Sequence, residues 1–227
     1  MSFFKASKKA EDVRQGGTNH IVRSGAYEVV IKAPVVSVSS GGSKSVDLFV
    51  DHQGQQQMVY GGLRVTNNDG SQNKIGAKIF NQLVIIADLE DVADPVDITL
   101  PIGKGGADKE VAALEDLAEM PVIMRIQMEY GIYRGNIQER KVIKSFFRVG
   151  DHASAEEIVN EKDFGSAWER EQKYLDHVTY KDGLDETAVA AWIAAGRPEG
   201  TGGKTSSPAG EKNPPFGNKR FGDKNAA

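Results

Sequence analysis

The stretch KIGAKIFNQLVIIADL, residues 74–89, changes the hydrophobic period of this chain and thereby limits the folds that it can adopt. Its branched apolar residues recur at spacings of four, four and three, at Ile75, Ile79, Leu83 and Ile86. This spacing predicts an amphipathic α-helix, because it places all four side chains on one helical face.

Five runs rich in valine and isoleucine surround this helix, three before it and two after it. They cover residues 26–40, 46–50, 57–65, 121–130 and 140–149. Runs of this composition, bounded by turn signals such as SSGGSKS and NNDG, predict β-strands. The order β-β-β-α-β-β is typical of a mainly β fold, the five-stranded OB-fold barrel with a helix between strands three and four.

Two of these strands carry signals of irregularity, and the insert before the fourth strand is less regular still. The first strand is expected to bend at Pro34, and the Gly61–Gly62 pair predicts a bulge in the third. The insert, residues 90–120, suggests a short strand at VDITL, a GKGG loop and a short acidic helix at VAALEDLAE.

Composition divides the chain into four parts. Residues 1–22 are polar and lysine-bearing, which predicts a flexible arm, and residues 23–150 hold the expected OB-fold domain. Residues 151–197 form an acidic, partly helical extension, in which DETAVAAWIAAG has a helix cap at Asp185 or Thr187. Residues 198–227 are rich in Gly, Pro and Lys and predict a disordered tail.

Composition also excludes several classes of protein. The chain has no cysteine, so it forms no disulfide, thiolate metal site or cysteine nucleophile. It has no apolar run near the roughly 20 residues of a membrane span, and its first residues lack a signal-peptide core. We expect a cytoplasmic protein that does not contact membranes.

No motif in the chain predicts catalysis, a metal or a cofactor. GKGG, residues 103–106, lacks the spacing of a phosphate-binding loop. The carboxylates at Glu90, Asp91 and Asp94 have no histidine or nucleophile nearby in the sequence. We therefore expect a protein that is not an enzyme.

The functional prediction comes from the side of the strands that faces away from the core. Side chains alternate along a strand, so parity sorts each strand into a core set and an outward set. The outward set and the last hairpin loop collect rings and cations, namely Lys32, Phe49, Tyr60, Arg64, Arg125, Tyr133, Arg134, Arg140, Lys144, Phe146 and Arg148. Exposed rings stack on bases, and Lys and Arg neutralise phosphates, so this face is predicted to bind single-stranded nucleic acid.

The segments GAYEVVIKAPVV, YGGLRVTNNDG, KIGAKIFNQLVIIADLED and MPVIMRIQMEYGIYRGNIQERKVIKSFFR resemble bacteriophage single-stranded-DNA-binding proteins of the OB-fold type. The resemblance covers roughly residues 24–150 and is one of layout. It implies a non-catalytic protein that coats and protects single-stranded DNA during phage replication, recombination or repair.

One departure from that family concerns the end of the chain. Many single-strand binders end in an acidic tip that recruits replication enzymes, whereas this chain ends NPPFGNKRFGDKNAA, which is mildly basic. Any recruitment of replication or recombination proteins is therefore expected from residues 151–227. A homo-oligomer or a cooperative assembly on DNA is compatible with the sequence.

Two other functions stay open on the sequence. A protein-interaction module of a replication complex would use the same rings and cations on an acidic partner and would ignore oligonucleotides. A metal-dependent nuclease would shorten a strand only when a divalent metal is present.

Overall fold

The computed structural model describes residues 19–103 and 106–198, and it is mainly β, with 43% strand and 23% helix. The predicted tail from residue 199 onward and most of the predicted arm lie outside these residues. The elements are β1 (Gly25–Val38), β2 (Lys44–His52), β3 (Gln55–Arg64), α2 (Lys74–Ile86), β4 (Val96–Leu100), β5 (Lys109–Ala113), η2 (Glu115–Leu117), β6 (Met120–Tyr133), β7 (Asn136–Arg148), α3 (Ala155–Asn160), α4 (Ser166–Glu171), η3 (Gln172–Tyr174), β8 (Val178–Tyr180) and α5 (Glu186–Ala194).

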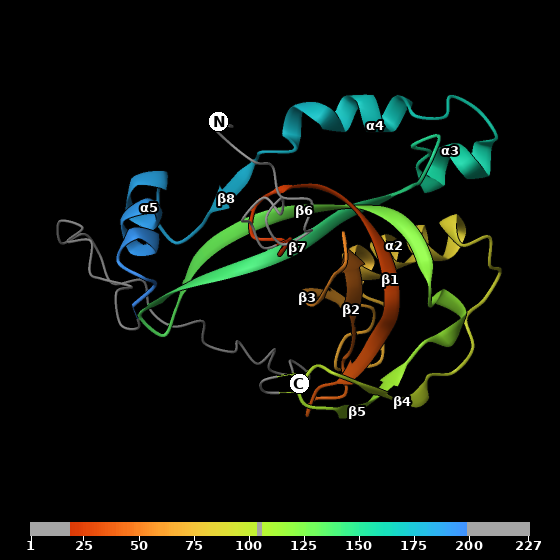
Figure 1. Ribbon diagram of the computed structural model, residues 1–227, viewed down its shortest axis with the longest axis horizontal. Helices are drawn as coiled ribbons and strands as arrows, with labels where there is room; N and C mark the ends of the chain where they lie inside the picture. The colour runs from red at the N-terminus through yellow and green to blue at the C-terminus, as the bar shows by residue number, and fades with distance from the viewer. Residues whose placement is uncertain (1–18, 104–105, 199–227) are drawn as a thin grey trace, which may run out of the picture.

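All eight strands described belong to one open sheet, which is antiparallel except where β8 joins β6 in parallel. The long strand β1 organises the sheet, since its first half pairs with β6 and its second half with β2. The register on β2 shifts between Ile31 and Ala33, so the irregularity of β1 precedes the expected Pro34. Figure 1 shows β1 as an arc across the middle of the molecule.

The strands β6 and β7 form a long hairpin whose tip projects past the other strands toward β8 and α5 (Figure 1). Its turn is only Arg134 and Gly135, which both adopt positive φ, 52° and 79°. Such a pair fits the two-residue turns that match the twist of a hairpin. The longer loop expected between the strands is therefore mostly paired strand.

Helix α2 forms where the period changes in the sequence. The Asn73 side chain caps its first turn by accepting hydrogen bonds from the backbone N–H groups of Ile75 and Gly76. Leu83 and Ile86 are buried as the spacing predicts, but Ile75 is 75% exposed. The buried side of the first turn is formed by Gly76 and Ala77, and Ile75 lies off that side of the helix.

The insert holds a β-hairpin in place of the expected acidic helix. VDITL forms β4 as predicted, but residues 109–113 pair with it as β5, and only the short turn η2 is helical. The stretch KEVAA pairs with β4 along its whole length, and Ala112 and Ala113 also pair with β1, so strand partners on both sides fix it as a strand. The helix prediction there was wrong, because a short apolar run does not fix the period.

The described residues after 150 form a partly helical extension that packs along the β6–β7 hairpin. Trp168 of α4 contacts the Phe147 ring edge-on, with ring centroids 5.2 Å apart. At the other end, Trp192 of α5 contacts Tyr130 in the same manner at 6.4 Å. Asp185 caps α5 through the backbone N–H of Ala188, as predicted.

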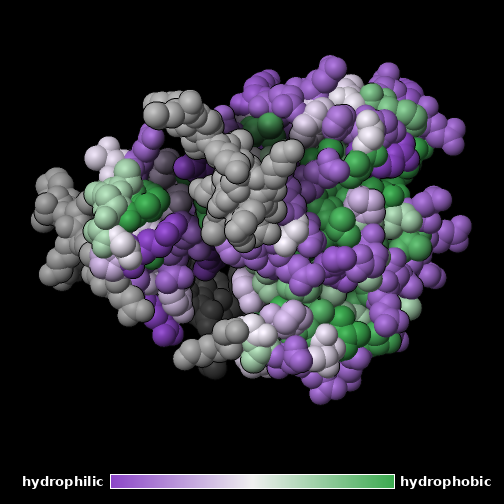
Figure 2. Space-filling model, viewed as in Figure 1, coloured by the Kyte–Doolittle hydropathy of each residue, from purple (hydrophilic) through white to green (hydrophobic). Residues whose placement is uncertain are grey.

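Part of the predicted arm also packs on the sheet. Ile21 is fully buried in the main core, and its N–H donates to the Gln57 side chain. The ordered domain therefore begins before residue 23. Figure 2 shows hydrophilic residues over most of the visible face, with hydrophobic ones in smaller patches between them.

Among the residues described, no helix combines the length and the apolar character that crossing a membrane requires.

Candidate nucleic-acid interface

A β-bulge in β7 reverses the face assignment at the end of this strand. Arg125 pairs with Ser145 and Ile126 with Ile143, so Lys144 is an extra residue without a partner. Beyond the bulge the parity inverts, and Phe146 points into the core with 1% exposure. The prediction of Phe146 as an outward stacking ring was therefore wrong.

Two further nominated residues are buried. Phe49 is 4% exposed because the β4–β5 hairpin covers it with Leu100 and Ala113, which the sequence did not indicate. Arg125 does lie opposite the core set of β6, but the extension covers that face and leaves it 7% exposed. Its guanidinium lies 2.8 Å from the Glu171 carboxylate and donates to the Tyr174 carbonyl at 3.1 Å. Neither side chain is available to DNA.

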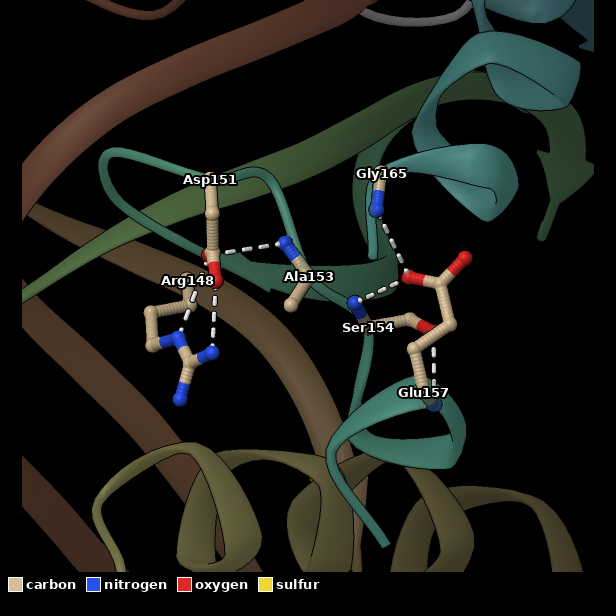
Figure 3. Close-up of polar contacts among 6 residues, drawn as sticks. All are labelled: Arg148, Asp151, Ala153, Ser154, Glu157 and Gly165. Carbon is tan, nitrogen blue, oxygen red and sulfur yellow. Dashed lines mark hydrogen bonds and ion pairs between the residues drawn. The ribbon is translucent and has the colours of Figure 1, made fainter. Parts of the chain in front are cut away.

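Lys32 and Arg148 are accessible but already engaged. The Lys32 Nζ lies 2.6 Å from the Glu119 carboxylate. Arg148 binds the Asp151 carboxylate through two nitrogens, at 3.1 and 2.5 Å (Figure 3). These bonds raise the pKa of Arg148 and hold that of Asp151 at about 2. Each of these two cations already has a carboxylate partner, so neither belongs to the set of cations without an ion pair described below.

The remaining six nominated residues are exposed, namely Tyr60, Arg64, Tyr133, Arg134, Arg140 and Lys144. The Tyr60 ring is 67% exposed on β3, and Tyr133 is 52% exposed at the hairpin tip. The Arg134 guanidinium lies 5.2 Å from the Tyr133 ring centroid. Within the described part of the chain, no carboxylate forms an ion pair with Arg64, Arg134, Arg140 or Lys144.

A groove brings several of these residues together. It lies between β3 and the edge of β7 that pairs with no other described strand, and its volume is about 540 Å³. We name it the β3–β7 groove; it is lined by Tyr60, Gly61, Gly62, Glu129, Glu139, Arg140, Lys141 and Val142. Of the six exposed residues predicted from the sequence, Tyr60 and Arg140 line the groove and the other four do not.

The glycine pair, predicted as a bulge, shapes this groove. A Cβ on Gly61 would lie 2.5 Å from the Ile143 side chain, so the missing side chain lets β3 approach β7 closely. Gly62 has φ +57°, and its N–H donates to the Asp47 carboxylate of β2. The prediction of a bulge is confirmed by the shifted register between β2 and β3.

Charges in the groove are set partly by the extension. Without partners of their own, the carboxylates of Glu129 and Glu139 would cancel the positive charges of Arg140 and Lys141. Glu129 is paired with Lys181, which follows β8. Glu139 lies 3.1 Å from Arg197 and also accepts a hydrogen bond from the Tyr130 hydroxyl. The groove therefore keeps a positive balance.

Burial perturbs two titratable groups in and beside the groove. Desolvation lowers the pKa of Lys141, although the nearby Glu139 carboxylate counteracts it. Burial and the same carboxylate raise the pKa of Tyr130 to about 12. Tyr130 therefore stays a neutral donor to Glu139 throughout the physiological range.

Sequence reasoning missed Lys141, Lys181 and Arg197. Alternation along β7 placed Lys141 on the core side of the strand. The groove lies at the open edge of β7, where side chains from both sides of the strand line it. Lys181 lies 52 residues from Glu129, and no local pattern connects them. The nearest signal was the acidic character of the extension, which suggested the opposite charge.

The described residues hold no group of three or more His, Asp or Glu side chains arranged to bind a metal ion. The sequence matches no protein-family model and no curated protein. The interface must therefore be interpreted from its own geometry.

Proposed function

We propose that this protein binds single-stranded DNA along the open edge of β7 and coats it during replication, recombination or repair, without catalysis. The observation that carries the proposal is a set of exposed rings and cations beside this edge and at the hairpin tip, whose cations form no ion pair with a described carboxylate. Tyr60 and Arg140 both line the β3–β7 groove, and Tyr133 and Arg134 form a ring–cation pair at the hairpin tip.

The chemistry of these residues favours a single strand over a duplex. Bases of a single strand expose their faces and can stack on Tyr60 and Tyr133, at roughly 1–3 kcal/mol per base. A duplex hides those faces and would offer only its phosphates. The overall charge of −4 opposes nonspecific duplex binding, while the local cations attract the strand.

The proposal includes an OB-type architecture in which the barrel remains open between β3 and β7. Three features support it. The first two are that β1 pairs with both β2 and β6 and that α2 follows β3. The third is the approach of β3 to β7 at Gly61 and Ile143, where an OB barrel would close. Ligands of OB-folds bind across this kind of strand surface.

The proposal also includes recruitment of replication or recombination proteins by the extension. This recruiting role is limited, because the large apolar side chains of the extension are used within the same chain. Trp168 and Trp192 pack on the hairpin of the same chain. A free interaction module would present such side chains to its partner. Exposed parts of the extension, and residues after 198, would have to provide the contact.

Substitutions in the groove and at the tip test the proposal. Tyr60→Ala and Tyr133→Ala should each weaken binding to oligo-dT about 5- to 150-fold with little change in salt slope, because they remove stacking. Arg140→Ala should weaken binding and flatten the slope of log K against log salt by about 0.7. Fluorescence anisotropy at several salt concentrations measures both quantities.

The matched control is Lys109→Ala, which removes an exposed cation from β5, outside the groove. It should leave affinity and slope close to those of the parent protein. Equal effects from Lys109→Ala and Arg140→Ala would contradict the proposal, since binding would then follow net charge alone.

A further inference from the structure

A second hollow lies on the same edge of β7, closer to the C-terminal end of the strand. We name it the α2–α4 cleft; its volume is about 610 Å³, and α2, β7, α3, α4 and η3 all contribute to its lining. The residues that matter below are Lys78, Glu156, Arg170, Glu171, Lys173 and Tyr174. None of these six residues was predicted from the sequence to bind DNA.

The cleft is cationic and carries an exposed ring. Within the described residues, no carboxylate forms an ion pair with Lys78, Arg170 or Lys173. Tyr174 is 48% exposed, and the Lys173 Nζ lies 5.0 Å from its ring centroid.

The two carboxylates of the cleft do not cancel these cations. Glu171 is already paired with the buried Arg125, at 2.8 Å. Only Glu156 remains to oppose the three cations. The combination of a ring, several cations and an excess of positive charge is the same chemistry as in the β3–β7 groove.

The cleft and the groove are consecutive along one strand. Residues 139–142 of β7 line the groove, and residues 145–147 line the cleft. The exposed Lys144 lies between them, at the bulge. The groove ends at residue 142 and the cleft begins at residue 145, three residues further along the strand. Three residues of a strand span about 10 Å. This distance corresponds to about three nucleotides at the stacked spacing of ~3.4 Å.

We propose that the α2–α4 cleft binds the continuation of the DNA strand that occupies the β3–β7 groove, with Tyr174 stacking on a base and Lys78, Arg170 and Lys173 contacting phosphates. This inference rests on the proposed function. It makes the extension part of the DNA site, because Arg170, Lys173 and Tyr174 all lie in it.

Oligonucleotide length tests the inference. The full chain is titrated with oligo-dT of about 4 to 24 nucleotides, a range that brackets the known site sizes of OB-folds. The parent protein should gain affinity until both hollows are filled. The double variant Arg170→Ala/Lys173→Ala should match the parent on the shortest strands but stop gaining affinity at a shorter length.

On the longest strands the double variant should bind roughly 10-fold more weakly, with a salt slope flatter by about 1.4 for two lost phosphate contacts. Tyr174→Ala should weaken binding to long strands without changing the slope. The Tyr174 carbonyl that receives the Arg125 hydrogen bond is retained in this variant, so the fold should persist. Lys109→Ala again serves as the control.

Unchanged binding of the double variant at every length would overturn the inference while leaving the proposed function intact. A loss of the same size at every length would also overturn it, because the cleft would then act as an independent site. Failure of the parent protein to bind any strand would instead refute the proposed function itself.

Discussion

At the scale of single residues, Arg197 and Glu139 show that distant parts of the chain set the charge of the groove. They lie 58 residues apart in the sequence and form an ion pair beside the β3–β7 groove. Glu139 is part of the groove lining, and Arg197 neutralises it from the end of the extension. Under the proposed function, a phosphate placed near Arg140 would therefore meet a site from which one repulsive charge has been removed.

This arrangement predicts a rescue between two substitutions. Arg197→Met should weaken binding to oligo-dT several-fold, because it leaves the Glu139 charge in the groove uncompensated. Adding Glu139→Gln should restore most of the lost affinity, since the repulsive charge is then absent. The measurement is a double-mutant cycle of dissociation constants at low salt. If the second substitution brings no recovery, Arg197 contacts the DNA directly.

Glu157 makes a second prediction at this scale, for stability. Burial alone would raise the pKa of its carboxyl, but hydrogen bonds from Ser154, Ser166 and Ala167 outweigh burial and hold the pKa at about 2. Figure 3 shows the bonds with Ser154 and the N–H of Gly165. Because this value lies below the ordinary 4.5, the charge stabilises the fold above pH 4.5, and the contribution disappears as the pH falls toward 2.

Glu157→Gln should therefore lower the free energy of unfolding at pH 7 by roughly 1–3 kcal/mol, since charged acceptors of several N–H groups are lost. The gap between parent and variant should narrow as the pH falls below 4.5. Urea denaturation at several pH values measures it. A gap that stays constant down to pH 2.5 would show that the charge of Glu157 is unimportant.

At the scale of elements, the contact between α2 and β3 determines where the helix sits. Gly76 is buried in the first turn of α2, and a Cβ there would lie 2.1 Å from the Arg64 carbonyl oxygen. That neighbour is backbone and cannot move aside as a side chain could. The glycine thus permits the close approach of the helix to the end of β3.

Gly76→Ala is expected to destabilise the protein, although alanine favours helices by about 1 kcal/mol over glycine. The clash should outweigh this gain and leave a net loss of roughly 1–3 kcal/mol. Lys78→Ala, on an exposed position of the same helix, should change stability by less than about 0.5 kcal/mol. Thermal unfolding of the two variants compares them. An unchanged or higher midpoint for Gly76→Ala would contradict the packing described.

The elements also show how far sequence reasoning reaches. The change of hydrophobic period located α2, and strand composition located the five main strands, because both signals are local. One extra residue, Lys144, reversed the faces at the end of β7 and turned Phe146 inward. Alternation cannot reveal a bulge that is fixed by pairing with another strand.

At the scale of the whole molecule, the extension decides which surfaces of the sheet remain available. It covers the face of β6 that carries Arg125, and β8 occupies part of the outer edge of β6. The open edge of β7 is left for a ligand, with the groove and the cleft along it. The sequence could not predict this choice, because docking of the extension depends on contacts between residues far apart in the chain.

The most direct test of the account is a titration of the full chain with fluorescent oligo-dT and with a duplex of equal length, at low and moderate salt. We predict tight binding to the single strand, weakening as salt rises with a slope of about −0.7 per phosphate contacted, and much weaker binding to the duplex. Equal affinity for both, or binding to neither, would contradict the central claim that exposed rings and cations along β7 hold a single strand.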